Sequence, residues 1–241
     1  QAARSNDWSQ LPAMLEYLAR PSAEEMVSAS LLRLLVDCPD PRAVAAARER
    51  LESDRSPLVR AAATELLARH RHDPRVRAAL IQGCRNEYRL VRVRSAIALS
   101  GAVGPRDPPE EREAWDRAIA EYRASLDCRP DDWASHYNLG NLHLDQGDAR
   151  AAAAAFAAAV RIAPEQPMPW VNGAIAHARA GDLATSEQWL RRALTADPTN
   201  AVANFNLALA VAERGRLDEA ETLLRRALAS DPRMAEAAYN L

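Results

Sequence analysis

The chain has 241 residues, of which 48 % are hydrophobic, and its formal net charge is -2. The hydrophobic fraction suffices for a core and excludes a chain that is disordered throughout. Aromatic residues make up 5 % of the sequence and Gly occurs 8 times, while Ala is abundant, which favours packed helices over a sheet. The small net charge gives no overall field for nucleic acid, and no apolar run is long enough to span a membrane. We therefore predict an all-α protein with no nucleic-acid partner and no membrane insertion.

In the N-terminal half, equivalent residues recur every 32 positions. Val27, Val59 and Val91 mark this register, and the aligned segments are MVSASLLRLL, LVRAAATELL and LVRVRSAIAL. Each segment is predicted to be the second helix of a hairpin. The first helices are expected over residues 11–18, 43–51 and 76–81.

The run PLVRAA at residues 57–62, with its echo VR at 91–92, resembles HEAT-like repeats of the phycobilisome-lyase type. The resemblance implies that Arg60 and Arg92 each pair with an acid near the preceding turn, where Asp54 and Glu87 are available. We assign residues 1–104 to these HEAT-like repeats.

Residues 101–109 read GAVGPRDPP, which is too rich in Gly and Pro to continue a helix. We place a linker at residues 105–108. The next segment has one apolar stripe and three Glu near its start, which complement a helix dipole. It looks like a lone second helix of the repeats that follow, and we predict that residues 109–132 cap their stack.

The C-terminal half repeats every 34 residues. Gly147, Gly181 and Gly215 are expected just past each first helix, where the chain turns through a left-handed conformation. A Pro after each second helix biases the residue before it away from helical geometry. These recurring Pro residues are Pro130, Pro164, Pro198 and Pro232.

This pattern resembles tetratricopeptide repeats, which implies an α-solenoid of helical hairpins wound into a superhelix. The units of this domain, residues 133–241, are 133–166, 167–200, 201–234 and a partial unit 235–241. Gly173 stands where neighbouring units carry Leu139 and Leu207, so we expect the second hairpin to pack less well.

Catalytic and cofactor motifs do not stand out in the sequence. It contains no phosphate-binding Gly-rich loop, nucleophile elbow, HExxH or CxxCH haem-attachment motif. His136, His143 and His177 could stack in the repeat frame, but no carboxylate or Cys joins them in register, so we interpret them as packing residues. The three Cys are interpreted as buried thiols. We expect no metal, no cofactor and no enzymatic activity.

An Asn recurs once in each unit at the same register. These residues are Asn138, Asn172, Asn206 and Asn240. An amide both donates and accepts hydrogen bonds, so a ladder of Asn along the concave groove could hold the backbone of an extended peptide. The ladder resembles that of the superhelical repeats in O-linked N-acetylglucosamine transferases. Asn at this position could equally satisfy local hydrogen bonds, and we leave both interpretations open.

The neighbours of the Asn ladder define the rest of the candidate groove. Its further residues are Tyr137, Val171, Phe205 and Asn141. Tyr137 and Phe205 stand where a basic residue would clamp the C-terminal carboxylate of a chaperone, so this partner class is disfavoured.

We predict a non-catalytic scaffold that binds a protein or peptide in the groove, with its oligomeric state left open. A second hypothesis follows from the order of the repeats, which looks like the C-terminal tail of bacterial multihaem c-type cytochromes. That resemblance implies an appendage of a redox enzyme and a periplasmic location, in place of a cytoplasmic one. A third, from the phycobilisome-lyase likeness, is a bilin lyase or isomerase. Leu241 falls within a new first helix, so we also expect the natural chain to continue.

Overall fold

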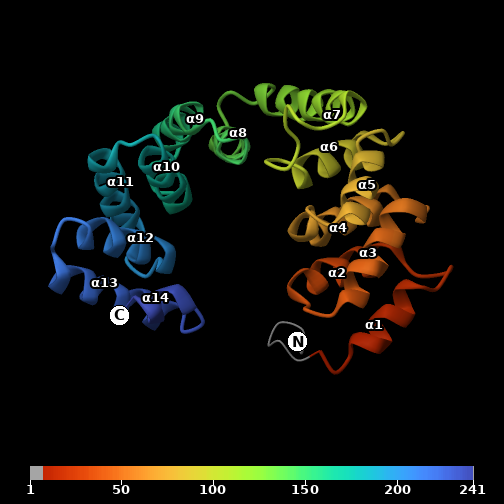
Figure 1. Ribbon diagram of the computed structural model, residues 1–241, viewed down its shortest axis with the longest axis horizontal. Helices are drawn as coiled ribbons and strands as arrows, with labels where there is room; N and C mark the ends of the chain where they lie inside the picture. Colours follow the sequence, from red (N-terminus) through yellow and green to blue (C-terminus); the bar gives the residue numbers. More distant parts are fainter. Residues whose placement is uncertain (1–7, 241) are drawn as a thin grey trace. The chain divides into compact units, whose positions relative to one another are not determined.

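The computed structural model describes residues 8–240, and every regular element within this range is helical. Leu241, which we expected within a new first helix, lies outside the described residues. The chain forms two compact units, Gln1–Ser125 and Leu126–Leu241, each of which is a stack of paired helices (Figure 1). The predicted all-α solenoid class is therefore confirmed.

The first unit contains three helical hairpins followed by one long helix. Its elements are α1 (Leu11–Leu18), α2 (Glu25–Leu34), η2 (Leu35–Asp37), α3 (Pro41–Ser53), α4 (Pro57–Leu67), η3 (Ala68–His70), α5 (Pro74–Gly83), α6 (Arg89–Ala98) and most of α7 (Pro109–Asp127). The side chains of Asp40, Ser56 and Asp73 cap α3, α4 and α5, and each is followed by Pro at the first helical position. The 32-residue period thus located all six hairpin helices, with ends that differ by a few residues.

The two Arg residues of this period bind carbonyl oxygens of the preceding turn. The Nε of Arg60 donates to the carbonyl of Asp54, and Nη1 of Arg92 donates to the carbonyls of Asn86 and Glu87, at 2.9 and 2.8 Å. The expected pairing with the carboxylates of Asp54 and Glu87 is wrong, because the free carbonyls of the turn lie closer to the guanidinium. Arg92 instead forms an ion pair with Glu121 on α7, in which its Nε and Nη2 donate to the two carboxylate oxygens, both at 2.9 Å.

Helix α7 and the loop before it are attached to the first unit by ion pairs and by a hydrogen bond of Trp115. Arg77 of α5 bonds Glu111 at 3.0 Å and Asp107 at 2.8 Å, and the indole Nε1 of Trp115 donates to the carbonyl of Ala96 at 2.9 Å. Residues 99–108 form an irregular loop, as predicted, but the boundary between the compact units falls after Ser125, inside α7. The predicted linker at residues 105–108 lies inside this loop, and its role as the boundary between the two kinds of repeat stays a prediction. That residues 109–132 cap the second stack stays a prediction.

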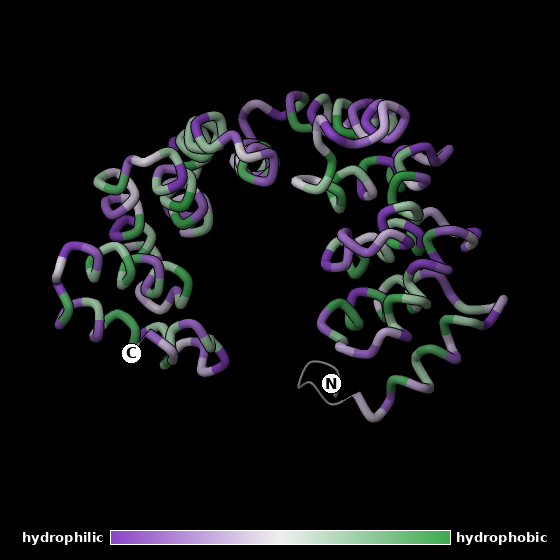
Figure 2. Tube along the Cα trace, in the orientation of Figure 1, coloured by the Kyte–Doolittle hydropathy of each residue, from purple (hydrophilic) through white to green (hydrophobic). Residues whose placement is uncertain are grey.

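The second unit stacks three hairpins of 34 residues and begins a fourth. Its helices are α8 (Trp133–Asp145), α9 (Ala149–Ile162), α10 (Pro167–Arg179), α11 (Leu183–Ala196), α12 (Ala201–Ala212), α13 (Leu217–Ser230) and α14 (Ala235–Tyr239). Gly147, Gly181 and Gly215 have φ of 79°, 86° and 76°, the left-handed conformation that the sequence predicted. In both units hydrophobic and hydrophilic residues intermix along each helix (Figure 2), as expected for amphipathic helices.

A recurring hydrogen bond ties each first helix of the second unit to the turn before it. His136, Trp170 and Asn204 are equivalent, and a side-chain nitrogen of each lies 2.9, 2.9 and 3.1 Å from the carbonyl oxygen of the Pro six residues earlier. This bond was not predicted from the sequence, although the three residues each lie six positions after the recurring Pro. The bond fixes the rotation of each first helix about its axis.

In the hairpin formed by α10 and α11, a small residue on α10, Gly173, packs against a large residue on α11, Trp189. A Cβ placed on Gly173 would lie 2.2 Å from the ring of Trp189, so the indole fills the space that Leu occupies in the neighbouring units. Trp189 stands where those units carry Ala155 and Leu223. The expectation that Gly173 weakens this hairpin is corrected, because Trp189 compensates for the missing side chain.

We predict that Gly173→Ala lowers the free energy of unfolding by about 1–3 kcal/mol, because the added methyl overlaps Trp189. In a Trp189→Leu background the same change should be neutral or raise stability by about 0.5–1 kcal/mol, since Ala favours a helix over Gly. Chemical denaturation of the four proteins measures this. Equal costs in both backgrounds would contradict the proposed compensation.

Candidate protein-binding face

The candidate site lies on the first helices of the second unit. Figure 1 shows α8, α10 and α12 along one side of this unit and α9, α11 and α13 along the other. Residues separated by three, four and seven positions share one stripe of a helix. We call this stripe on the three helices the first-helix face. It comprises Ala134, Tyr137, Asn138, Asn141, Met168, Val171, Asn172, Ile175, Val202, Phe205, Asn206 and Leu209.

The structure brings Asn172 together with two other predicted site residues on the neighbouring helix. Its Nδ2 donates to Oδ1 of Asn141 at 2.8 Å and to the hydroxyl of Tyr137 at 3.1 Å. Both acceptors are on α8, so the amide joins two successive repeats. The amide N–H groups of Asn172 are therefore engaged inside the protein.

The other amides of the ladder differ in their surroundings. Nδ2 of Asn206 donates to the carbonyl of Val202 at 2.9 Å, and Nδ2 of Asn240 donates to that of Glu236 at 2.6 Å, both one turn earlier in the chain. Asn138 is half-buried and Asn240 is exposed. The Oδ1 of Asn206 has no hydrogen-bond partner within residues 8–240 and is an available acceptor.

The predicted apolar neighbours of the ladder are mostly covered by packing. Val171 is fully buried in the core of the unit, and Phe205 packs against the same core. Tyr137 packs on Phe156, with 5.9 Å between ring centroids. These residues support the face, and they expose little surface to a partner.

Three exposed aliphatic residues lie on the same stripe, and the predicted groove included neither Met168 nor Val202. Met168 is 45 % exposed, Val202 is 44 % exposed and Leu209 is 37 % exposed. Met168 and Val202 are equivalent in successive repeats, and Leu209 lies two turns after Val202. The 34-residue frame together with the helical stripe would have found them.

None of the twelve residues of the first-helix face is Asp, Glu, Lys or Arg, although these four types make up 27 % of the chain. At that frequency about three of the twelve would be charged (0.27 × 12). The surface formed by α11 and the turn before α13 carries several charged residues.

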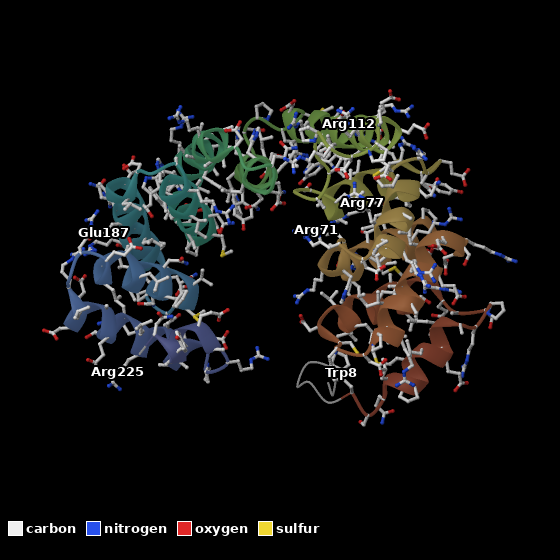
Figure 3. All side chains as sticks on the ribbon, in the orientation of Figure 1. Trp8, Arg71, Arg77, Arg112, Glu187 and Arg225 are labelled. Carbon is white, nitrogen blue, oxygen red and sulfur yellow. The ribbon has the colours of Figure 1, made fainter. Side chains whose placement is uncertain are left out.

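Glu187 of α11, which is labelled in Figure 3, lies at the centre of a cluster of ion pairs. This carboxylate contacts Arg191 at 2.9 Å, Arg216 at 2.6 Å, and Arg214. Burial raises the pKa of Glu187. The hydrogen bond from Arg216 and the charges of the three Arg residues together lower it by more than burial raises it, so the pKa lies below its ordinary value. Arg214 and Arg216 come from the turn around Gly215, so the cluster joins the second repeat to the third.

The Cys and His residues were considered as possible reactive or metal-binding groups, and their burial and contacts are as follows. Cys38 and Cys84 are buried as predicted, whereas Cys128 is exposed, which corrects that prediction. Burial raises the pKa of Cys84 to about 12, so this thiol is protonated at neutral pH. His177 lies 3.7 Å from the carboxylate of Asp182 and packs on Trp189. Residues 8–240 contain no group of three or more His, Cys, Asp or Glu placed to hold a metal ion.

Within the part of the chain that the structure describes, no helix combines the length and apolar character needed to cross a membrane.

Comparison with known families identifies the repeats of the second unit. Two family models of the tetratricopeptide repeat match residues 110–167 and 177–241. The chain contains tetratricopeptide repeats. The first match includes α7 from residue 110 and the hairpin α8–α9. The second match includes helix α11 and the hairpin α12–α13. A comparison with curated proteins gives no significant match.

Solved structures with tetratricopeptide-like helical stacks are similar to parts of this chain. A crystal structure of MamA is 19 % identical, with a TM-score of 0.48, over 54 % of this chain and 75 % of that one. The first tetratricopeptide-repeat domain of Spaghetti (RPAP3), bound to the HSP90 peptide SRMEEVD, is 23 % identical, with a TM-score of 0.44, over 46 % of this chain and 87 % of that one.

We predict different effects for two amides of the ladder. Asn172→Ala should lower the free energy of unfolding by about 1–2 kcal/mol, because it removes two hydrogen bonds to α8. Asn206→Ala should change stability by less than about 0.5 kcal/mol, because its bond returns to its own helix and Ala is the better helix former. Urea denaturation distinguishes them, and equal effects would contradict the assignment of Asn172 to the contact between repeats.

Glu187→Gln should lower the free energy of unfolding at pH 7 by about 1–3 kcal/mol, because charged hydrogen bonds are lost. The lowered pKa of Glu187 means that its contribution is present above the unfolded value of 4.5 and is lost as the pH falls through the lower folded value. The difference between the variant and the wild type should therefore shrink below about pH 4.5. Thermal unfolding of both proteins from pH 3 to 8 measures this, and a constant difference would argue against the ion pairs.

Proposed function

We propose that this chain is a non-catalytic scaffold that binds a segment of a partner protein on the first-helix face. The observation that carries the proposal is the combination of exposed aliphatic side chains with regularly placed amides on a surface without charged residues. Exposed apolar side chains gathered on one face are typical of protein-interaction surfaces. Tetratricopeptide repeats supply a rigid stack on which such a face extends from one repeat to the next.

Within this proposal, the amides of the ladder have different roles. Asn172 orients the face through α8, whereas Asn138, Asn206 and Asn240 are the candidates for direct contact with a partner. The Oδ1 of Asn206 could accept a backbone N–H of an extended segment. Tyr137, Asn141, Val171 and Phe205 form the support beneath these contacts.

The first unit contains three hairpins of its own, which we interpret as HEAT-like repeats. Their role as part of a redox-enzyme appendage remains a prediction, because the catalytic part of such an enzyme is not in this chain. The bilin lyase hypothesis stays a prediction; of the three thiols, Cys38 and Cys84 are buried and Cys128 is exposed.

The substitution Val202→Arg tests the proposed face, because it places a charge among its exposed aliphatic residues. The matched control is Leu217→Arg, which introduces the same charge at a residue that is 66 % exposed on α13. Both variants should keep the wild-type melting temperature, since neither side chain is in the core.

We expect the proteins that co-purify with the wild-type chain from its native cells to be retained by Leu217→Arg and reduced at least about tenfold with Val202→Arg, a loss of about 1.4 kcal/mol. Quantitative mass spectrometry of the three preparations measures this. Equal recovery with Val202→Arg would show that partners bind elsewhere.

A further inference from the structure

A second candidate site lies in the first unit, in a cavity between α3 and the start of α5, two helices that are labelled in Figure 1. The cavity has a volume of about 370 Å³. Part of its lining is apolar and consists of Pro39, Pro41, Val44, Ala45 and Val76. The other lining residues are titratable, and they are Arg48, His70, Asp73 and Arg75. The cavity therefore combines apolar side chains with three basic groups and one carboxylate.

The carboxylate of Asp73 is engaged by the backbone of α5. Its Oδ1 accepts hydrogen bonds from the N–H of Val76 at 3.1 Å and from that of Arg75 at 2.8 Å. These two bonds, followed by the charges of Arg75 and Arg48, hold the pKa of Asp73 below its ordinary value. The negative charge of Asp73 is therefore already compensated inside the protein.

The basic side chains of the cavity keep N–H groups available for a ligand. Arg75 and His70 are exposed, and neither side chain makes a hydrogen bond or an ion pair with another residue in the range 8–240. Arg48 contacts Glu52 through Nη1 alone, at 3.1 Å, so its Nε and Nη2 have no partner in that range. An anion that enters the cavity thus meets two guanidinium groups with unused donors.

The acids next to the cavity leave these donors unused. Asp40, which stands between the two prolines of the lining, is bound by Arg42 at 2.7 Å. In the cavity between α1 and α3, by contrast, every lining Arg forms an ion pair, namely Arg42, Arg48 and Arg50. Arg75 distinguishes the cavity beside α5, because it is a lining guanidinium without an ion pair in the described part of the chain.

We propose that this cavity binds an acidic segment of a partner protein that carries aliphatic side chains beside its carboxylates. The inference goes beyond the proposed function, because it concerns the first unit and is independent of the first-helix face. A guanidinium group matches the planar geometry of a carboxylate and donates to both of its oxygens. The apolar lining adds stabilisation by burying an aliphatic side chain, which a nucleic acid does not have.

Four labelled probes separate the elements of this proposal. The first is acetyl-(Asp-Leu-Asp-Gly)3-amide. The second, acetyl-(Asn-Leu-Asn-Gly)3-amide, removes the charge, and the third, acetyl-(Asp-Ser-Asp-Gly)3-amide, removes the aliphatic side chains. The fourth is a single-stranded DNA of twelve thymidines. Each carries the same uncharged fluorescent label and is titrated with the full chain by fluorescence anisotropy.

Two variants change the cavity and two control variants leave it intact. Arg75→Gln and Arg48→Gln each remove one of its guanidinium groups. Arg94→Gln removes an exposed Arg of α6 that does not line the cavity, and Val202→Arg changes the first-helix face. All four should keep the wild-type melting temperature, because none of these side chains is in the core and the exposed ion pair of Arg48 contributes little.

We expect the first peptide to bind at least about fivefold more tightly than the second and the third. Arg75→Gln and Arg48→Gln should each weaken its binding at least about threefold, and Arg94→Gln and Val202→Arg should leave it unchanged. Equal binding of the Asp and Asn peptides, or equal weakening by Arg94→Gln and Arg75→Gln, would overturn the cavity as an anion site.

The remaining outcomes judge the nature of the partner. Equal binding of the Leu and Ser peptides would overturn the aliphatic part of the proposal. If the DNA binds more tightly than the first peptide and Arg75→Gln weakens it, the protein partner is overturned in favour of a nucleic acid. Absence of binding by all four probes would overturn the inference alone, because the co-purification experiment judges the first-helix face separately.

Discussion

The fold depends on side chains that satisfy backbone carbonyls in the turns before α4, α6, α8, α10 and α12. In both units a side chain from the next helix returns to the carbonyl of a residue six positions earlier. Arg60 and Arg92 do so in the first unit, and His136, Trp170 and Asn204 do so in the second. Guanidinium, imidazole, indole and amide groups thus perform one task, because each places an N–H at the required distance.

In the second unit this bond also determines which surface faces outward. It engages the fourth residue of each unit, and the first-helix face uses the second, fifth, sixth and ninth. At 100° per residue, the fourth residue lies about 150° from the centre of that stripe. Anchoring one side of a first helix to the preceding turn therefore directs the other side away from it. The face is a consequence of the turn chemistry, repeated every 34 residues.

Residue spacing predicted the elements that depend on local chemistry. Gly147, Gly181 and Gly215 mark turns whose geometry one residue decides, and the 32-residue period located the hairpins of the first unit. Contacts between residues far apart in the sequence could not be predicted in the same way. The bonds of Asn172 depend on residues 31 and 35 positions away, and the packing of Gly173 depends on Trp189. A repeat alignment treats such positions as equivalent, although the volume and polarity of their neighbours differ from unit to unit.

The distribution of charge explains why one helix start departs from the repeat pattern. Asp148 and Asp182 cap α9 and α11 through their side chains, but the equivalent residue before α13 is Arg216, which gives no such cap in the described structure. A lost cap costs about 1 kcal/mol. Arg216 instead contacts Glu187 and Glu219, joining the second and third repeats through α11 and α13. Electrostatic cohesion between repeats is thereby concentrated beside the second helices, and the first helices remain free to present an uncharged surface.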